Sequence, residues 1–397
     1  MEMGESVGEW KKHHLGDFAK IQTGPFGSQL HASDYVNEGI PSIMPTNIGS
    51  RLEIKLDSIV YIKNEDAARL NRYLVQENDI VYSRRGDVEK CAFITKNESG
   101  WLCGTGCLRI RFVSEELLPK FCAYYLSTEE IKGWVSGNAV GTTMPNLNSS
   151  ILQRLPVNLP PIHEQRAITA VLSSLDDKID LLHRQNQTLE AMAETLFRQW
   201  FVEEAGEDWE EKSLSHIATF LNGLACQKYP PKNALDKLPV LKIKELSSGI
   251  SESSDWASND VKSEYIVENG DVIFAWSASL MVKIWHGEQC VLNQHLFKVT
   301  SADYPKWFYF MWCKHHLEEF IAISASHATT MGHIKRGDLD TAIVLVPNDN
   351  ELQAMSVQMI PLLEKQIAVS RQLATLEKLR DNLLPKLMSG DVRIATA

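Results

Sequence analysis

The stretch LDDKIDLLHRQNQTLEAMAETLFRQWF, residues 175–201, carries apolar side chains at steps that alternate between four and three. The positions on this stripe are Leu175, Ile179, Leu182, Leu189, Ala193, Leu196 and Trp200. This alternation is the heptad pattern of a helix that pairs with a second helix. Asn186 occupies the one stripe position between Leu182 and Leu189. It either fixes the register of the pair or is a simple excursion to the surface.

A second heptad stretch closes the chain. Its apolar positions are Leu362, Val369, Leu373, Leu376 and Leu383. Gln366 and Arg380 interrupt the stripe, and Pro361 suggests a kink or a late helix start. We expect the two helices to pair antiparallel with each other. The alternative is that each helix packs only on its own neighbouring module.

The two helices belong to a tandem repeat that covers the chain. The segment LGDFAKIQTG at residues 15–24 aligns with LSHIATFLNG at 214–223, and LPVNLP at 155–160 aligns with AIVLVP at 342–347. The tails then match at a constant offset of 187 residues, as in Glu164 with Glu351 and Lys178 with Lys365. Several matches in the same order indicate that a module and its helix were duplicated.

The repeat sets the expected domains and fold class. Short β-rich runs such as DIVYS at 79–83 and DVIFAW at 271–276 alternate with Gly, Pro and Asn turns. A helical stretch, 119–134 in one module and 305–323 in the other, closes each module. We predict an α+β protein, with two similar α/β domains separated by two long helices that form an antiparallel coiled coil. The expected modules are residues 1–160 and 205–347, and the expected helices are residues 161–204 and 348–397.

Composition limits the function classes. The chain carries a net charge of −11, with −3 in residues 1–150 and −5 in residues 205–347. DNA-binding domains tend to be basic, so any DNA contact must rely on local charge and on partners that grip the phosphates. The seven cysteines are scattered, and no apolar run reaches eighteen residues. The N-terminus lacks the features of a signal peptide. We therefore predict a cytoplasmic protein that does not enter a membrane. Cys103 and Cys107 lack a second ligand pair, so we expect no metal.

Motifs for catalysis are missing from the sequence. The nearest approach to the base-gripping motif of adenine methyltransferases is NLPPI at 158–162, which has an intervening Leu159 and no aromatic residue. The pair Gly104 and Gly106 is not a dinucleotide fingerprint, and no phosphate-binding loop occurs. The triplet Glu210–Lys212 reads as a solvated linker rather than part of a nuclease. We therefore expect no catalytic residues and no cofactor.

Several loops carry side chains that suit DNA contact. Arg84 and Arg85 form a basic doublet that follows a predicted strand, although they could instead pair with Asp87 and Glu89. In the loop GPFGSQ at 24–29, the candidates Gly27, Ser28 and Gln29 could meet phosphate or base, unless the loop is a plain turn. A third loop contains Thr142, Thr143 and Asn146. These side chains could contact phosphates or bases, or they could cap a helix instead.

The second module has its own candidates. The loop equivalent to residues 142–146 contains Thr329, Thr330, His333, Lys335 and Arg336. Lys242 and Lys244 alternate and are expected to lie on one face of a strand. Trp276 takes the position of the arginine doublet, although a Trp is more commonly a core residue.

At this point the residues resemble a known family. LPVNLPPIHEQRAI at 155–168, followed by residues 175–201, resembles the central region of type I restriction–modification specificity subunits. LEKLRDNLLPKLMSGDVRI at 376–394 resembles the second such region. GPFGSQLHASDYVNEGIPSIMPTNI at 24–48 is similar to the start of a target-recognition domain, as are residues 79–86 and 141–147 to its later motifs.

The resemblance implies a non-catalytic specificity subunit. Each module would be a target-recognition domain for one half of a bipartite sequence in double-stranded DNA, and the helices would act as a ruler. The implied partners are two methyltransferase (modification) subunits and the motor–nuclease (restriction) subunits. The second module departs from the pattern at AWSAS, 275–279, and at TMGHI, 330–334, which fits two modules that read different half-sites. The alternatives are a protein-binding scaffold without DNA readout and the recognition part of a DNA methyltransferase.

Overall fold

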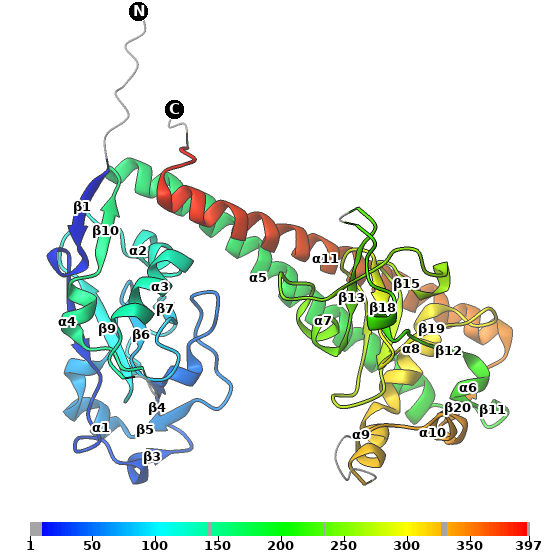
Figure 1. Ribbon diagram of the computed structural model, residues 1–397. Helices are drawn as coiled ribbons and strands as arrows, with labels where there is room; N and C mark the ends of the chain where they lie inside the picture. Colours follow the sequence, from blue (N-terminus) through cyan, green and yellow to red (C-terminus); the bar gives the residue numbers. More distant parts are fainter. Residues whose placement is uncertain (1–9, 142–144, 234, 327–331, 395–397) are drawn as a thin grey trace, which may run out of the picture. The chain divides into compact units, whose positions relative to one another are not determined.

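The computed structural model describes residues 10–141, 145–233, 235–326 and 332–394 (Figure 1). The chain divides into two compact units. The first comprises Met1–Asp177 with Lys378–Ala397, and the second comprises Lys178–Glu377. Each unit therefore holds one globular module and a part of both long helices. Among the described residues, no helix is both long enough and apolar enough to cross a membrane.

The first unit is built on two small four-stranded sheets. The first sheet has the antiparallel order β2 (Ala19–Thr23), β9 (Cys107–Phe112), β6 (Ile80–Ser83) and β7 (Cys91–Phe93). The second has the order β3 (Tyr35–Val36), β5 (Val60–Ile62), β4 (Ile40–Ile43) and β8 (Leu102–Cys103), with β4 and β8 parallel. A separate ribbon pairs β1 (Lys11–His14) with β10 (Pro156–Leu159).

Helices pack against both sheets of this unit. α1 (Asn64–Arg69) packs against the second sheet, and α2 (Pro119–Leu126), α3 (Glu129–Asn138) and α4 (Ser149–Gln153) belong to the core of the first. Ile80, Tyr82 and Phe121 are fully buried in the core between strands and helices. The helical stretch expected from Pro119 is broken in two, because Thr128 adopts an extended backbone conformation at the start of α3.

The second unit is also built on two four-stranded sheets and a two-stranded ribbon. Its first sheet has the order β12 (Thr219–Asn222), β19 (Leu296–Thr300), β16 (Val272–Ala275) and β17 (Met281–Ile284). Its second sheet has the order β14 (Trp256–Ala257), β13 (Leu238–Leu241), β18 (Cys290–Leu292) and β15 (Ile266–Val267), and β11 (Glu210–Ser213) pairs with β20 (Ile343–Val346). The helices are α6 (Leu214–Ile217), α7 (Ile243–Ser248), α8 (Lys306–His315), α9 (Leu317–Ser326) and α10 (Arg336–Thr341). The first sheets have the same strand order, and each second sheet contains one parallel pair, β4 with β8 and β13 with β18, which agrees with a duplicated α/β module.

The two long helices are α5 (Ile162–Arg198) and α11 (Asp349–Ser389), drawn in green and red in Figure 1. Within the second unit, Asn186 contacts Ser370 and His183 contacts Glu377. Residue numbers fall along α11 as they rise along α5, so the pair is antiparallel. The seam buries Ile179, Leu182, Val369 and Leu373, with Leu189 and Leu376 packed against them. The predicted antiparallel coiled coil is confirmed.

Pro361 does not delay the second helix, which already begins at Asp349. The expectation of a late start is wrong. A proline inside a helix leaves the carbonyl four residues earlier, here that of Val357, without its usual N–H donor. Both Pro361 and Val357 are exposed, so water can satisfy that carbonyl.

A polar pair interrupts the apolar seam and yields a stability prediction. Asn186 donates from Nδ2 to Ser370 Oγ over 2.7 Å, while its buried Oδ1 has no partner among the described residues. A buried polar atom without a partner costs about 1–3 kcal/mol. We expect Asn186→Leu to raise the free energy of unfolding by about 1 kcal/mol, and Ser370→Ala to lower it by about as much.

Urea unfolding of the wild-type chain and of these two variants measures the changes in the free energy of unfolding. Gln187→Leu, at the exposed neighbouring position, is the matched control and should leave the midpoint unchanged. A destabilised Asn186→Leu variant would show that the polar pair contributes net stability to the seam.

Candidate nucleic-acid interface

The candidate residues of the first unit gather at one edge of its first sheet. β2 and β6 end, and β9 begins, at this edge, because Thr23 pairs with Leu108 and Ser83 pairs with Cys107. The loop 24–29, the loop 84–86 and the turn 104–106 therefore leave the sheet side by side. We call these three segments, with residues 145–147, the first edge. Arg85 and Asn146 form an antiparallel bridge that ties 145–147 to 84–86.

The arginine doublet is oriented by this edge rather than by acidic neighbours. Arg84 is half-buried, donates from Nε to the Leu147 carbonyl over 3.3 Å and lies 5.3 Å from the Phe26 ring centroid. Arg85 is exposed. Burial, and then the charge of Arg85, lower the pKa of Arg84, which still leaves an arginine charged at neutral pH.

The acids proposed as alternative partners of the doublet are otherwise engaged. Asp87 forms an ion pair with Lys90 at 2.8 Å, and Glu89 accepts a hydrogen bond from Ser136 Oγ at 2.5 Å. No ion pair joins either acid to Arg84 or Arg85 in the part of the chain that the structure describes. The doublet is thus a local positive charge on an acidic module.

The glycine loop is partly exposed and partly tethered. Gly27 and Ser28 are exposed, and Phe26 keeps half of its surface exposed. The Gln29 amide turns inward, because its Oε1 accepts a hydrogen bond from Tyr73 Oη at 2.7 Å. Gln29 must release Tyr73 before it can reach a base through this oxygen.

Asn146 lies on the first edge with a buried Oδ1 that has no partner among the described residues. It does not cap the following helix. Asn148 does so, since its Oδ1 accepts from the Ile151 N–H over 2.9 Å. Thr142 and Thr143 lie outside the described residues.

The second unit forms an equivalent edge. A Cβ on Gly24 would lie 2.2 Å from the Gly104 carbonyl oxygen, and a Cβ on Gly223 would lie 2.3 Å from that of Asn293. Both glycines are therefore required for the same close approach of two backbone segments. We call the loop 223–229, residues 276–278, the turn 293–295 and residues 332–334 the second edge.

Trp276 stands where the first edge carries Arg84. The Ile334 N–H donates to the Trp276 carbonyl oxygen over 3.1 Å. In the first unit, the Leu147 N–H donates to the Arg84 carbonyl oxygen over 2.9 Å. Trp276 is half-buried and stacks on Phe297 at 5.6 Å between ring centroids, while its Nε1 donates to Asn222 Oδ1 over 3.1 Å. The aromatic ring therefore forms part of the edge and part of the underlying core.

The remaining candidates of the second module separate into two groups. His333 is exposed and bridges to Ser277, which places it on the second edge. Lys335 and Arg336 are exposed at the start of α10, so they extend from the predicted loop into a helix. Thr329 and Thr330 lie outside the described residues.

The expectation that Lys242 and Lys244 share a strand face is wrong. β13 ends at Leu241, and α7 begins at Ile243 with Lys242 before its first turn. A helix forms here instead of a longer strand, because the Glu245 side chain accepts a hydrogen bond from the Lys242 backbone N–H over 3.3 Å and so caps the helix start. The Lys242 ammonium then pairs with Asp255, and that of Lys244 donates to Ser253 Oγ over 2.7 Å.

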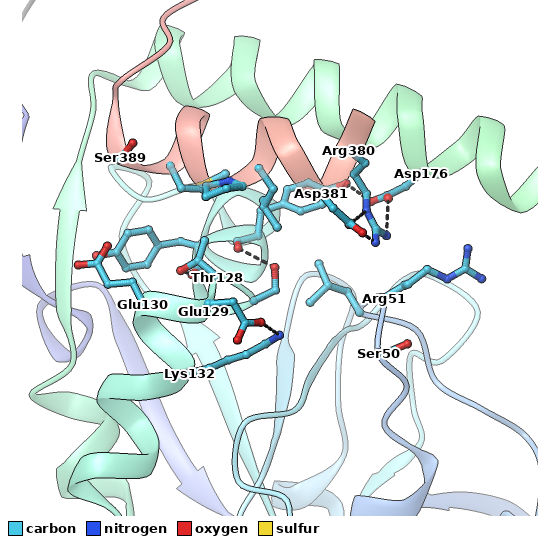
Figure 2. A pocket seen from close by; sticks show the side chains of 17 residues that line it. Ser50, Arg51, Thr128, Glu129, Glu130, Lys132, Asp176, Arg380, Asp381 and Ser389 are labelled. Atoms are coloured by element: carbon cyan, nitrogen blue, oxygen red, sulfur yellow. Dashed lines mark hydrogen bonds and ion pairs between the residues drawn. The ribbon is translucent and has the colours of Figure 1, made fainter. Parts of the chain in front are cut away.

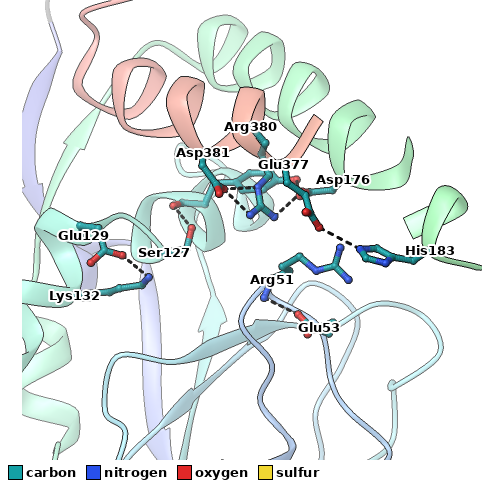
Figure 3. Close-up of polar contacts among 11 residues, drawn as sticks. Arg51, Glu53, Ser127, Glu129, Lys132, Asp176, His183, Glu377, Arg380 and Asp381 are labelled. Atoms are coloured by element: carbon teal, nitrogen blue, oxygen red, sulfur yellow. Dashed lines mark hydrogen bonds and ion pairs between the residues drawn. The ribbon is translucent and has the colours of Figure 1, made fainter. Parts of the chain in front are cut away.

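A cavity of about 450 Å³ lies elsewhere in the first unit (Figure 2). It lies between α2, α3, the segment 50–52 and the long helices. Its charged side chains largely pair with one another, as Figure 3 shows. Lys132 contacts Glu129 at 2.7 Å, and Arg380 contacts Asp381 at 2.6 Å and Asp176 at 3.5 Å. The interruption of the seam by Arg380 thus has a structural partner in Asp176.

No metal-binding group is evident within the described ranges, where no three His, Cys, Asp or Glu side chains are placed to hold an ion. Cys103 and Cys107 are buried and free. Burial raises the pKa of Cys103 to about 12, so its thiol is protonated at neutral pH.

The architecture defines a class of protein: two like modules with similar edges, joined through an antiparallel pair of helices. A solved structure with this fold is the type I restriction–modification S subunit from M. genitalium, with a TM-score of 0.64 over 100% of this chain and 99% of that chain at 16% identity. The family model described as "Type I restriction modification DNA specificity domain" matches residues 8–191 and again 206–378. The chain therefore belongs to the type I restriction–modification DNA specificity family.

Curated relatives match along the whole chain. The type I restriction enzyme MjaIX specificity subunit of Methanocaldococcus jannaschii is 27% identical over 421 residues, which covers 99% of this chain and 96% of that protein. The MjaVIII specificity subunit of the same organism is 22% identical and covers 97% and 93%. The resemblance seen in the sequence is confirmed.

Proposed function

We propose that this chain reads a bipartite target in double-stranded DNA, with one half-site for each module. The supporting observation is the pair of equivalent edges. They share backbone geometry but present different side chains, Arg84 and Arg85 on one and Trp276 and Ser277 on the other. Two modules that recognise different half-sites require a shared backbone framework that carries different side chains at the DNA-contacting edge.

The proposed subunit is non-catalytic, uses no cofactor and acts in the cytoplasm. Its partners would be two methyltransferase (modification) subunits and the restriction (motor–nuclease) subunits. The net charge of −11 supports a role for partners in DNA binding, because phosphate neutralisation provides much of DNA affinity. We assign recognition to residues 1–160 and 205–347, and spacing to residues 161–204 and 348–397.

A domain exchange tests the proposal. Replacing residues 1–160 by the equivalent module of a related specificity subunit should change one half of the methylated target and preserve the other half and its spacing. Methylation-sensitive sequencing of a host that expresses the hybrid with its modification subunits gives the result.

Two outcomes would contradict the independence of the modules: a hybrid that changes both halves, or one that changes neither. A protein-binding scaffold would be indicated if the unaltered chain, together with its modification subunits, binds all DNA sequences equally in a salt-dependent gel shift.

A further inference from the structure

The two edges place their long polar side chains on different segments. On the first edge, the strand-end loop carries Arg84 and Arg85, and the facing turn is Gly104-Thr105-Gly106. That turn tolerates little else, since a Cβ on Gly104 would lie 2.6 Å from the Ile43 carbonyl oxygen and Gly106 has φ +89°. The first edge therefore has no long polar side chain on the turn opposite its arginines.

The second edge reverses this arrangement. Its strand-end loop carries Trp276 and Ser277, whereas the facing turn is Asn293-Gln294-His295. The backbone of this turn is fixed, because the Gln294 N–H bonds the Leu224 carbonyl at 2.8 Å and the Asn293 N–H bonds that of Leu241 at 3.1 Å. We infer that Gln294 is a specificity-determining residue of the second module, that it recognises an adenine in the major groove, and that His295 positions it.

His295 is held on both sides of its ring. Its Nδ1 lies 3.2 Å from Ser277 Oγ, its Nε2 lies 3.3 Å from Gln294 Nε2, and its ring centroid lies 6.0 Å from that of Trp276. The amide nitrogen of Gln294 can only donate, so His295 Nε2 accepts and the ring proton is on Nδ1. His295 thereby connects the amide of Gln294 to the platform formed by Trp276 and Ser277.

The amide of Gln294 then keeps one N–H and its Oε1 for a ligand. Within the described residues, no hydrogen bond engages Oε1. One donor beside one acceptor on a planar amide matches adenine, which presents the N7 acceptor and the N6 amino donor in the major groove. The first edge offers guanidinium groups, whose match is guanine. The inference rests on the proposed function and assigns different bases to its two half-sites.

The test compares Gln294→Ala, Gln294→Glu and His295→Ala in the full chain, each co-expressed with its modification subunits. The methylated target is read by sequencing, and binding is measured on duplexes that vary each position of the second half-site. Gln294→Ala should reduce discrimination for adenine at one position by about tenfold or more. Gln294→Glu should shift that position toward cytosine, whose amino group a carboxylate accepts.

His295→Ala should relax the same position by a smaller factor and leave the other positions unchanged, which a general loss of folding would not do. Gln289→Ala is the matched control, since Gln289 is exposed in the same unit and bonds Glu268 at 2.9 Å. If Gln294→Ala fails to fold in a thermal melt, Gln294→Glu decides the question, because it preserves side-chain size.

The inference is overturned if the wild-type chain reads a bipartite target and the Gln294 variants read the same target with equal discrimination. A wild-type chain without sequence preference would instead overturn the proposed function itself. The two failures are therefore distinguishable in one set of measurements.

Discussion

Inserting four residues into each long helix should preserve both half-site sequences and move them one or two base pairs farther apart. The insertions belong after Gln185 in α5 and after Ser370 in α11, which face each other across the seam through the bond between Asn186 and Ser370. Four residues add about 6 Å and turn a helix by about 40° beyond a full revolution. A heptad seam accepts this as a stutter. At about 3.4 Å per base pair, 6 Å corresponds to at most two base pairs.

A single residue inserted after Gln185 alone is the contrasting variant. It turns the following part of α5 by about 100° and takes Leu189 out of register with the apolar residues of α11. We expect this variant to lose methylation of the target altogether. The methylated sequence of a host carrying each variant provides the measurement. An unchanged spacer after the paired four-residue insertions would mean that the helices hold partners without measuring DNA.

The long helices were the most predictable part of the fold, because heptad spacing is a strong local signal repeated over several turns. Shorter elements were decided by interactions that the residue pattern does not reveal. The alternation of Lys242 and Lys244 suggested a strand, but a cap from Glu245 starts a helix there. The helical pattern after Pro119 gave no sign of the break at Thr128, which depends on a single backbone conformation.

The candidate site divides in the same way. Arg84 and Arg85 were recognisable because a basic doublet follows a β-rich run. Gln294 and His295 were missed, because Asn293-Gln-His295 shares no letter with Gly104-Thr-Gly106. Their equivalence depends on backbone contacts, with Gly24 against Gly104 and Gly223 against Asn293. The tandem repeat implies that the two turns are equivalent, but only the three-dimensional structure aligns them residue by residue.

The double variant Arg84→Ala with Arg85→Ala should weaken binding to the target by several kcal/mol at most, since a good bidentate base contact contributes about 1–3 kcal/mol. The loss should fall on one half-site. The loop itself should persist, because the bonds that fix it run through backbone atoms, such as that from the Leu147 N–H to the Arg84 carbonyl. Arg154→Ala is a control that removes one positive charge elsewhere in the unit, because Arg154 is exposed just after α4, next to Gln153, which packs against Gly16.

Two measurements then separate base contact from phosphate contact for the doublet. If Arg84 and Arg85 read bases, the methylated motif of the double variant relaxes at one or two positions of the first half-site. If they bind phosphates, the motif persists and the slope of log affinity against log salt falls by about one for each lost contact. Arg84→Lys with Arg85→Lys keeps the charges but removes the planar fork, so it should restore the salt slope and not the motif. Normal methylation of the normal site by the double alanine variant would show that the first edge does not contact DNA through these residues.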